Sequence, residues 1–335
     1  MKTPDNKPAA ADDIAPWTHY WATGALHSCS NAFDRNYDDE VRNFWADFFG
    51  QLKEGARVLD IGTGNGAVAF LARDVGERLG RTFQIEGIDA AIIDPAAAAS
   101  RFGLPLGNLV LRGLIRSEKT DYPSQYFAAV SSQFAIEYTN VDESLKEMAR
   151  ILKPGGVAGF VMHHSESQAL QTTLAELKVF SYLRHEAPVV TLARRLLRKP
   201  VADGAGAITL FARDRDSEKE RKEFDRVVLR TESYIRQRPQ AAFVDGIVQQ
   251  VGGVLRRTQS IGPAAAIAQL DILESEMIAH QARLNAIARA AFDRQGIDGF
   301  CERVANAGFS VQDPRELRRQ GKDLLGWVIE ARRAT

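Results

Sequence analysis

The sequence is poor in cysteine and has no excess charge of either sign. Its 335 residues include two cysteines, Cys29 and Cys301, which lie far apart and outside any Cys-x-x-Cys or Cys/His ligand spacing. We therefore expect neither a disulfide framework nor a metal site. The 43 Lys and Arg residues balance 43 Asp and Glu residues, so the chain has no net positive charge to neutralise a phosphate backbone. This disfavours a nucleic-acid partner and favours a small-molecule substrate.

Long hydrophobic runs are also missing. The first residues, MKTPDNKPAAADD, are polar and lack the apolar stretch of a secretory signal. No run approaches the ~20 apolar residues that span a bilayer. With two free thiols, this predicts a cytoplasmic protein without an integral membrane segment. Hydrophobic content of 45% is ordinary for a globular chain, and a homodimer is the assembly that we consider.

Strand-like and helical patterns alternate in the first half of the chain. Apolar runs of strand type occur at 57–61, 82–89, 108–111, 126–131 and 157–162. Helical patterns separate them, and two more extended pieces follow at 309–312 and 324–331. The alternation predicts an α/β fold, a doubly wound, Rossmann-like sheet of seven strands that ends in an antiparallel pair.

The remaining residues are organised around this core. After His164 the pattern becomes mainly helical, with the best helices at 167–183, 217–237 and 263–292. The predicted parts are a disordered tail at 1–13, an aromatic and helical segment at 14–56 with a helix at 38–52, a core at 57–164 and 293–335 with a helix at 299–308, and a helical insertion at 165–292. We expect the insertion to serve as a substrate lid.

The most informative stretch is VLDIGTGNG, from Val58 to Gly66. Its three glycines stand between a strand and a helix, where the backbone can approach a ligand closely and present N–H groups. A dinucleotide site of the type G-x-G-x-x-G would place its last glycine, or an alanine, at Ala67, so the spacing alone leaves nicotinamide and S-adenosylmethionine (SAM) open. Asp60 favours SAM, because a carboxylate beside the loop would oppose a pyrophosphate but attract a sulfonium and an ammonium group.

Asp89 ends the second strand. A carboxylate there can accept hydrogen bonds from both ribose hydroxyls, a role that fits NAD as well as SAM. The alternative is that Asp89 caps the turn that follows. Together with the loop, it predicts a nucleoside-type ligand.

Three motifs resemble the class I SAM-dependent methyltransferases, in particular the small-molecule enzymes similar to those of ubiquinone biosynthesis. They are D-x-G-x-G-x-G (60–66), SSQFAIEY (131–138) and LKEMARILKPGGVAGF (145–160). The resemblance implies SAM as cofactor, held by Asp60, Gly62, Thr63, Gly64, Gly66, Asp89, Ala90, Leu114, Ile115 and Gln133. Many relatives have an acid after the third strand, whereas this chain has Leu114 and Ile115. We therefore expect the adenine to lie on backbone groups and on these apolar side chains.

Histidines supply the candidate catalytic bases. His163 and His164 end the fifth strand, at the edge where doubly wound folds bind ligands, and strand alternation lets only one point each way. His27 lies in the aromatic segment and either closes over the ligand or packs there. Glu137, after the fourth strand, borders the donor or caps a helix.

These expectations add up to a SAM-dependent methyltransferase acting on a small, hydrophobic or aromatic acceptor. Oxygen is the favoured methylated atom, before carbon and nitrogen. The alternatives are an NAD(P)-dependent oxidoreductase and a non-catalytic SAM-fold binding protein.

Overall fold

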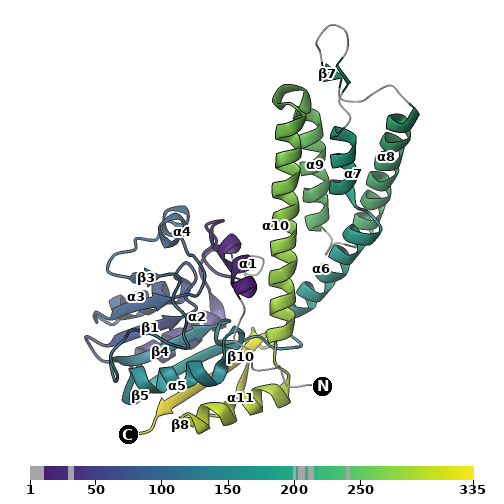
Figure 1. Cartoon of the computed structure of the whole chain (residues 1–335). Coiled ribbons are helices and arrows are strands. Elements are labelled where there is room, and N and C mark those ends of the chain that lie inside the picture. The colour runs from purple at the N-terminus through teal and green to yellow at the C-terminus, as the bar shows by residue number, and fades with distance from the viewer. Residues whose placement is uncertain (1–10, 29–33, 199–200, 203–207, 210–214, 239–241) are drawn as a thin grey trace. The chain divides into compact units, whose positions relative to one another are not determined.

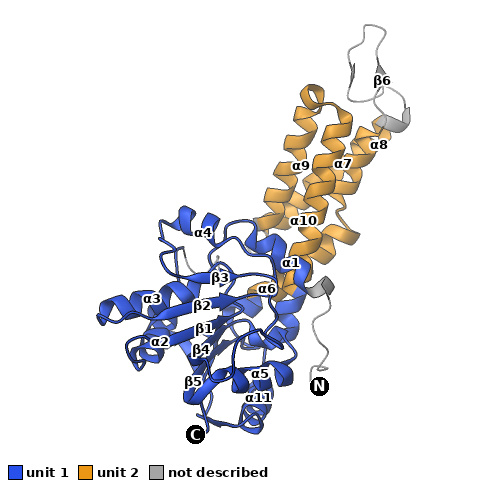
Figure 2. Ribbon diagram, turned by 60° about the vertical axis from the view of Figure 1, so that its left-hand side comes forward, with its two compact units in different colours: residues 1–171, 285–335 blue, residues 172–284 orange. Residues whose placement is uncertain are grey.

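The chain folds into two compact units. The computed structural model describes residues 11–28, 34–198, 201–202, 208–209, 215–238 and 242–335. Unit 1 comprises residues 1–171 and 285–335, and unit 2 comprises residues 172–284 (Figure 2). Cys29 lies outside the described residues, and Cys301 is a free thiol.

Unit 1 holds a central sheet with helices on both faces (Figure 1). Its strands are β1 (Arg57–Ile61), β2 (Gln84–Ile88), β3 (Val110–Arg112), β4 (Phe127–Gln133), β5 (Leu152–Met162), β8 (Phe309–Val311), β9 (Arg315–Arg319) and β10 (Asp323–Arg333). Its helices are α1 (Ala11–Trp21), α2 (Asp39–Gly50), α3 (Ala67–Arg78), α4 (Pro95–Phe102), the short 3-10 helix η1 (Ile136–Tyr138), α5 (Val141–Ile151) and α11 (Arg294–Asn306).

The strand order of the sheet is β3-β2-β1-β4-β5-β10-β8, and β9 pairs with β10 beside this path. Strands β1 to β5 are parallel to their neighbours, whereas β10 runs antiparallel to β5. The order reverses between β1 and β4, which makes their carboxyl ends the switch point where doubly wound sheets bind ligands. The predicted α/β, mostly parallel fold is confirmed, with β9 as a strand beyond the seven expected.

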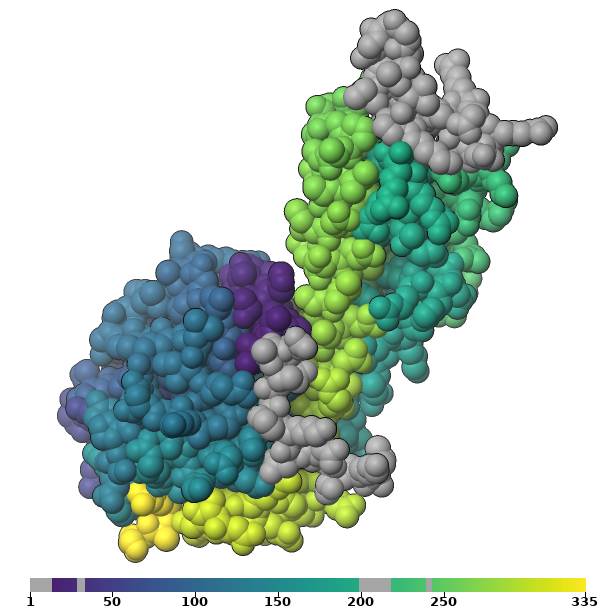
Figure 3. Space-filling view, in the orientation of Figure 1, coloured from purple at the N-terminus to yellow at the C-terminus, as the bar shows by residue number. Residues whose placement is uncertain are grey.

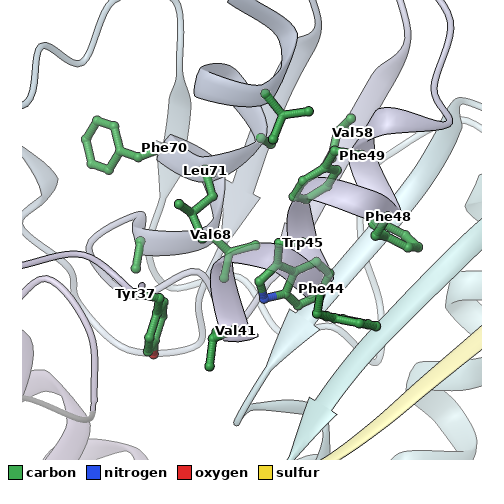
Figure 4. Close-up of a cluster of buried hydrophobic side chains, with 14 of the residues drawn as sticks. Tyr37, Val41, Phe44, Trp45, Phe48, Phe49, Val58, Val68, Phe70 and Leu71 are labelled. Atoms are coloured by element: carbon green, nitrogen blue, oxygen red, sulfur yellow. The ribbon is translucent and has the colours of Figure 1, made fainter. Parts of the chain in front are cut away.

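Each face of the sheet carries its own hydrophobic core. On one face, α2 and α3 pack over β1 through aromatic side chains such as Trp45, Phe49 and Phe70, each 0% exposed (Figure 4). On the other face, α5 and α11 pack against Phe127 and Phe160. Helix α2 forms because its apolar residues recur at helical spacing and all face this core. The two layers hold the carboxyl ends of the strands in fixed positions.

Unit 2 is mainly helical. It contains α7 (Val189–Leu197), α8 (Arg215–Arg236) and α9 (Ala242–Ile261), together with most of α6 (Gln168–His185) and of α10 (Pro263–Ala290). A pair of two-residue strands, β6 (Val201–Ala202) and β7 (Ile208–Thr209), is antiparallel. The helices share a core that includes Tyr182, Val244 and Leu270. None of the helices in the described ranges is both long and apolar enough to cross a bilayer.

Several boundaries differ from the sequence-based expectations. The tail was expected to reach residue 13, but α1 begins at Ala11, and residues 1–10 lie outside the described part. Strand β5 begins at Leu152 rather than Val157, because its pairing with β4 skips the Lys-Pro-Gly-Gly residues between them. Helix α11 begins at Arg294 rather than Gly299, since Asp293 caps it by accepting from the Gly296 N–H at 2.8 Å.

The insertion expected at 165–292 contains the whole of unit 2. Three helices of the insertion were expected, and the structure adds α7 and α9. In unit 1, the charged strand β9 was not expected. The role of the insertion as a lid stays a prediction.

Candidate active site

The glycine loop joins β1 to α3 at the switch point. Gly62, Gly64 and Gly66 have φ values of 66°, 52° and 99°, a backbone region that favours glycine. A Cβ atom at Gly64 would lie 2.5 Å from the ring of Trp21, and one at Gly62 would overlap the side chain of Ala135. Both packing and backbone conformation therefore require glycine at these positions.

Asp60 is the penultimate residue of the buried strand β1, two residues before Gly62. Its side chain accepts a hydrogen bond from the Ser131 hydroxyl at 2.8 Å through Oδ1, while Oδ2 is buried without a partner. Burial raises the pKa of Asp60 to about 7; the nearby hydroxyls of Thr63 and Ser131 act against this rise, and the charge of Asp89 adds to it. A cationic ligand would compensate this carboxylate.

Asp89 follows β2, the strand that pairs with β1. Its Oδ2 accepts from the Gly64 N–H at 2.9 Å and its Oδ1 from the Ala91 N–H at 2.8 Å. Withdrawal from water raises the pKa of Asp89 to about 6, and the two N–H groups oppose the rise. Asp89 therefore caps the turn that follows it, which was one of the two roles expected. Its oxygens keep further lone pairs that can accept hydrogen bonds, beside the half-buried Ala90.

The segment after β3 lies beside the Asp89 turn. Leu114 donates its N–H to the Ala91 oxygen, and Ile115 donates its N–H to the Asp89 oxygen. Leu114 has a φ of 61° and is 74% exposed, whereas Ile115 packs against the core. An exposed apolar side chain beside the Asp89 turn is a suitable surface for a flat, apolar ring.

Gln133 ends β4, next to β1. Its Oε1 accepts a hydrogen bond from the Trp45 indole N–H, and its Nε2 is buried without a partner. The buried Thr63 hydroxyl in the glycine loop lies near the Asp60 carboxylate but makes no hydrogen bond of ordinary geometry. Buried polar atoms are usually paired. These orphaned groups, with the bare carboxylate of Asp60, fit the polar and cationic amino-acid portion of SAM.

Helix α1 covers the glycine loop. The buried amide of Asn65 donates to the backbone oxygens of Trp21 and Ala25 at 3.0 and 2.7 Å. Thr18 accepts from the Ile92 N–H at 3.1 Å. In Figure 3 this N-terminal segment, in purple, lies against the blue residues of unit 1. The segment thus excludes water from the loop.

His27 anchors the aromatic segment. Its Nε2 lies 2.6 Å from the Arg35 carbonyl oxygen, and its ring stacks on Tyr37 with 4.5 Å between centroids. Burial lowers the pKa of His27. With Nε2 held by a carbonyl, His27 packs the segment, one of the two roles expected for it.

His163 and His164 point to opposite faces of the sheet. His163 Nδ1 lies 2.7 Å from Glu137 Oε1, and both side chains are buried. His164 stacks on Trp327 at 4.4 Å, and its Nδ1 accepts from the Glu166 N–H at 2.9 Å. Burial lowers the pKa of His164. His163 shares the face of Asp60 and Gln133, while His164 stabilises the strand end.

Sequence reasoning missed the partners that hold this site. The Trp45 indole on Gln133 and the Asn65 amide on the end of the α1 segment were not among the expected contacts. Glu137 was placed near the donor, but its contact with His163 was not foreseen. That contact follows from topology, because β4 and β5 are parallel neighbours and their carboxyl ends meet.

Comparison with known proteins supports the family. Residues 33–196 match the family model described as a methyltransferase domain. The ubiquinone/menaquinone biosynthesis C-methyltransferase UbiE of Chromobacterium violaceum is 35% identical over 116 residues, which cover 34% of this chain and 46% of that protein. The protein of the same name from Bordetella parapertussis is 30% identical over 176 residues, 47% of this chain and 66% of that one. The chain thus spans about half to two thirds of these curated relatives.

Solved structures resemble the chain more loosely. An S-adenosylmethionine-dependent methyltransferase from Mesorhizobium loti covers 86% of this chain and 97% of its own, with 14% identity and a TM-score of 0.40. A SAM-dependent methyltransferase from Methanosarcina mazei covers 89% and 99%, with 14% identity and a TM-score of 0.39. From the family match and the glycine loop with its two carboxylates, we conclude that the chain carries a class I SAM-dependent methyltransferase domain.

Proposed function

We propose that this protein transfers a methyl group from SAM to a small, hydrophobic or aromatic acceptor. A hydroxyl oxygen is the favoured acceptor atom, and an acidic carbon is the second. The names of the curated relatives, which are C-methyltransferases, support the second. The buried histidine on the ligand face of the sheet supports either, because both acceptors give up a proton.

The observation that carries the proposal is the bare carboxylate of Asp60 beside the glycine loop. SAM supplies a methyl group that its positively charged sulfonium already activates. The chain supplies the Asp60 carboxylate with its unpartnered Oδ2, while Asp89 accepts from the Gly64 N–H of the loop. Charge-assisted contacts of this kind are stronger where water is excluded.

The side chains around His163 are aromatic. Trp17 of α1 contacts Tyr138 with ring centroids 5.4 Å apart, and Phe134 lies 4.4 Å from the ring of His163. Flat apolar faces favour an aromatic or hydrophobic acceptor over a highly charged one. Methyl transfer is an in-line displacement, so fixing the acceptor against such walls contributes through orientation.

Calorimetry with the full chain tests the donor. We expect SAM and S-adenosylhomocysteine to bind and NADPH not to bind. Asp60→Asn should weaken SAM binding by about tenfold or more, because it removes the charge opposite the cation. As a matched control, Asp74→Asn changes a carboxylate on α3 that pairs with Arg73 at 3.1 Å and should leave SAM binding unchanged. Binding of NADPH in preference to SAM would restore the oxidoreductase alternative.

A further inference from the structure

A buried acid and a buried histidine form a pair that donor binding does not explain. The side chain of Glu137 is 0% exposed and that of His163 is 5% exposed. Glu137 Oε1 accepts from the His163 backbone N–H at 3.1 Å and lies 2.7 Å from Nδ1 of the same residue. The second oxygen of Glu137 is buried without a partner. A carboxyl group is costly to bury in this way unless a neighbouring group compensates its charge.

The contact fixes the position of the proton on the imidazole. An ionised carboxylate only accepts hydrogen bonds, so Nδ1 carries the hydrogen and Nε2 keeps its lone pair. Among the described residues, Nε2 of His163 makes no hydrogen bond. The Tyr138 hydroxyl, 3.5 Å from Nδ1, is the other titratable group at the ring. Enzymes that activate a nucleophile use the same arrangement, in which an acid orients a base that keeps a free lone pair. Here Glu137 is the acid and His163 is the base.

The pair lies beside the donor loop. Glu137 stands two residues after Ala135, whose side chain occupies the space that a Cβ of Gly62 would fill. Tyr138 joins the ring of His163, at 5.8 Å, to that of Trp17, at 5.4 Å. Trp17 stacks on Trp21, which covers Gly64. A continuous set of contacts thus connects the pair to the loop that holds the donor.

We propose that Glu137 is a positioning residue that holds His163 as the base of the reaction, and that the acceptor is a compound that loses a proton on methylation. Phenols and carbon acids flanked by carbonyl groups belong to this class, whereas thioethers and tertiary amines do not. This inference rests on the proposed function and deepens it by naming the acceptor class.

In the proposed step, the acceptor loses a proton to His163 and gains the methyl group of SAM. The acceptor O–H or C–H proton passes to Nε2 of His163, and the electron pair left on oxygen or carbon forms the new bond to the methyl carbon. The bond between that carbon and sulfur breaks, and its electrons return to sulfur, which becomes a neutral thioether. The resulting imidazolium is compensated by Glu137 and then gives its proton to water.

Histidine nuclear magnetic resonance tests the pair without any turnover. His27 holds Nε2 against a carbonyl oxygen, and His164 accepts an N–H at Nδ1, so both carry their hydrogen on Nε2. In full-length protein labelled with ¹⁵N-histidine at pH 8, His163 should be the buried histidine with its hydrogen on Nδ1. His163→Gln and His164→Gln assign the signals, and Glu137→Gln should yield a mixture of tautomers. A hydrogen on Nε2 of His163 in the unmodified protein would overturn the proposal.

Kinetics with methyl-labelled SAM test the acceptor class. The panel contains phenols, 1,3-dicarbonyl compounds, a thioether and a tertiary amine. We expect methylation of the first two classes, with kcat about 100-fold lower in His163→Gln and about 10-fold to 100-fold lower in Glu137→Gln. The KM for SAM should stay within about twofold. The loss of kcat in His163→Gln should become smaller as the pH approaches the phenol's own pKa of about 10, because an ionised phenol needs no base. A structural defect would not produce this dependence on pH.

His164→Gln is the matched control, because it changes the neighbouring histidine on the opposite face. Equal rates in His163→Gln and the unmodified protein at every pH, or methylation of none of the proton-losing compounds, would overturn the inference. If SAM binds normally in that case, the proposed function survives. If SAM does not bind at all, the proposed function fails first.

Discussion

Replacing Gly64 by alanine separates the two reasons for glycine in the donor loop. Gly64 has a φ of 52°, and a Cβ there would lie 2.5 Å from Cη2 and 2.6 Å from Cζ2 of the buried Trp21 ring. Gly80 offers a matched control, since its φ of 64° is similar and nothing lies within 4 Å of its Cβ position. Both substitutions carry a left-handed backbone cost of about 1–2 kcal/mol. In Gly64→Ala, but not in Gly80→Ala, the new methyl group also displaces the ring of Trp21.

Displacing a packed ring costs about 1–3 kcal/mol. We therefore expect Gly64→Ala to reduce the free energy of unfolding of unit 1 by about 2–5 kcal/mol, and Gly80→Ala by about 1–2 kcal/mol. All four tryptophans belong to unit 1, so tryptophan fluorescence in urea reports on that unit. SAM affinity by calorimetry should fall about tenfold or more in Gly64→Ala, an energy of about 1.4 kcal/mol, and stay unchanged in Gly80→Ala. Equal effects of the two variants on stability and affinity would refute the reasoning.

Two further predictions concern the carboxylate and the cover of the loop. Burial raises the pKa of Asp60 to about 7, so between about pH 4 and pH 7 the unliganded native state keeps a proton that the unfolded chain has released. The contribution of Asp60 to stability is therefore present below about pH 4 and is lost as the pH rises through 7. Asp60→Asn should therefore become more stable than the unmodified protein as pH rises from 4 to 8, by up to about 4 kcal/mol at pH 8. A difference in the free energy of unfolding between the two proteins that stays constant from about pH 4 to 8 would contradict the burial of an unpaired carboxylate. Asn65→Ala removes both bonds that tie the amide to the α1 segment and the bond that its Oδ1 accepts from the Asp94 N–H. It should lower the free energy of unfolding by about 2–4 kcal/mol, against about 1 kcal/mol for the exposed helix cap in Asn140→Ala. Similar losses in the two variants would show that the amide does not secure the cover.

The sequence predicted those parts of the fold that local patterns control. The alternation of strands and helices identified the parallel sheet, and the glycine spacing located the loop between β1 and α3. Strand β9 escaped prediction because it is charged and pairs only with β10, so neither apolar content nor period marks it. Helix α7 was not among the helices expected from the sequence, because its nine residues give too short a pattern to stand out.

Contacts between distant segments were harder to predict. Nothing in the sequence connects Asn65 to the end of α1, because the amide recognises backbone oxygens and these carry no residue signal. The choice between His163 and His164 depended on which face each one takes, and strand alternation could say only that they differ. The contact with Glu137 is the reason for which we propose His163 rather than His164 as the base.

The central claim is that this chain methylates a small molecule. It is tested most directly by incubating the full-length protein with methyl-labelled SAM and a small-molecule extract of its host, and then identifying the labelled products. We predict label in a small, hydrophobic or aromatic compound, and its loss in Asp60→Asn. Label confined to RNA or protein, or no label in any product despite SAM binding, would contradict the account.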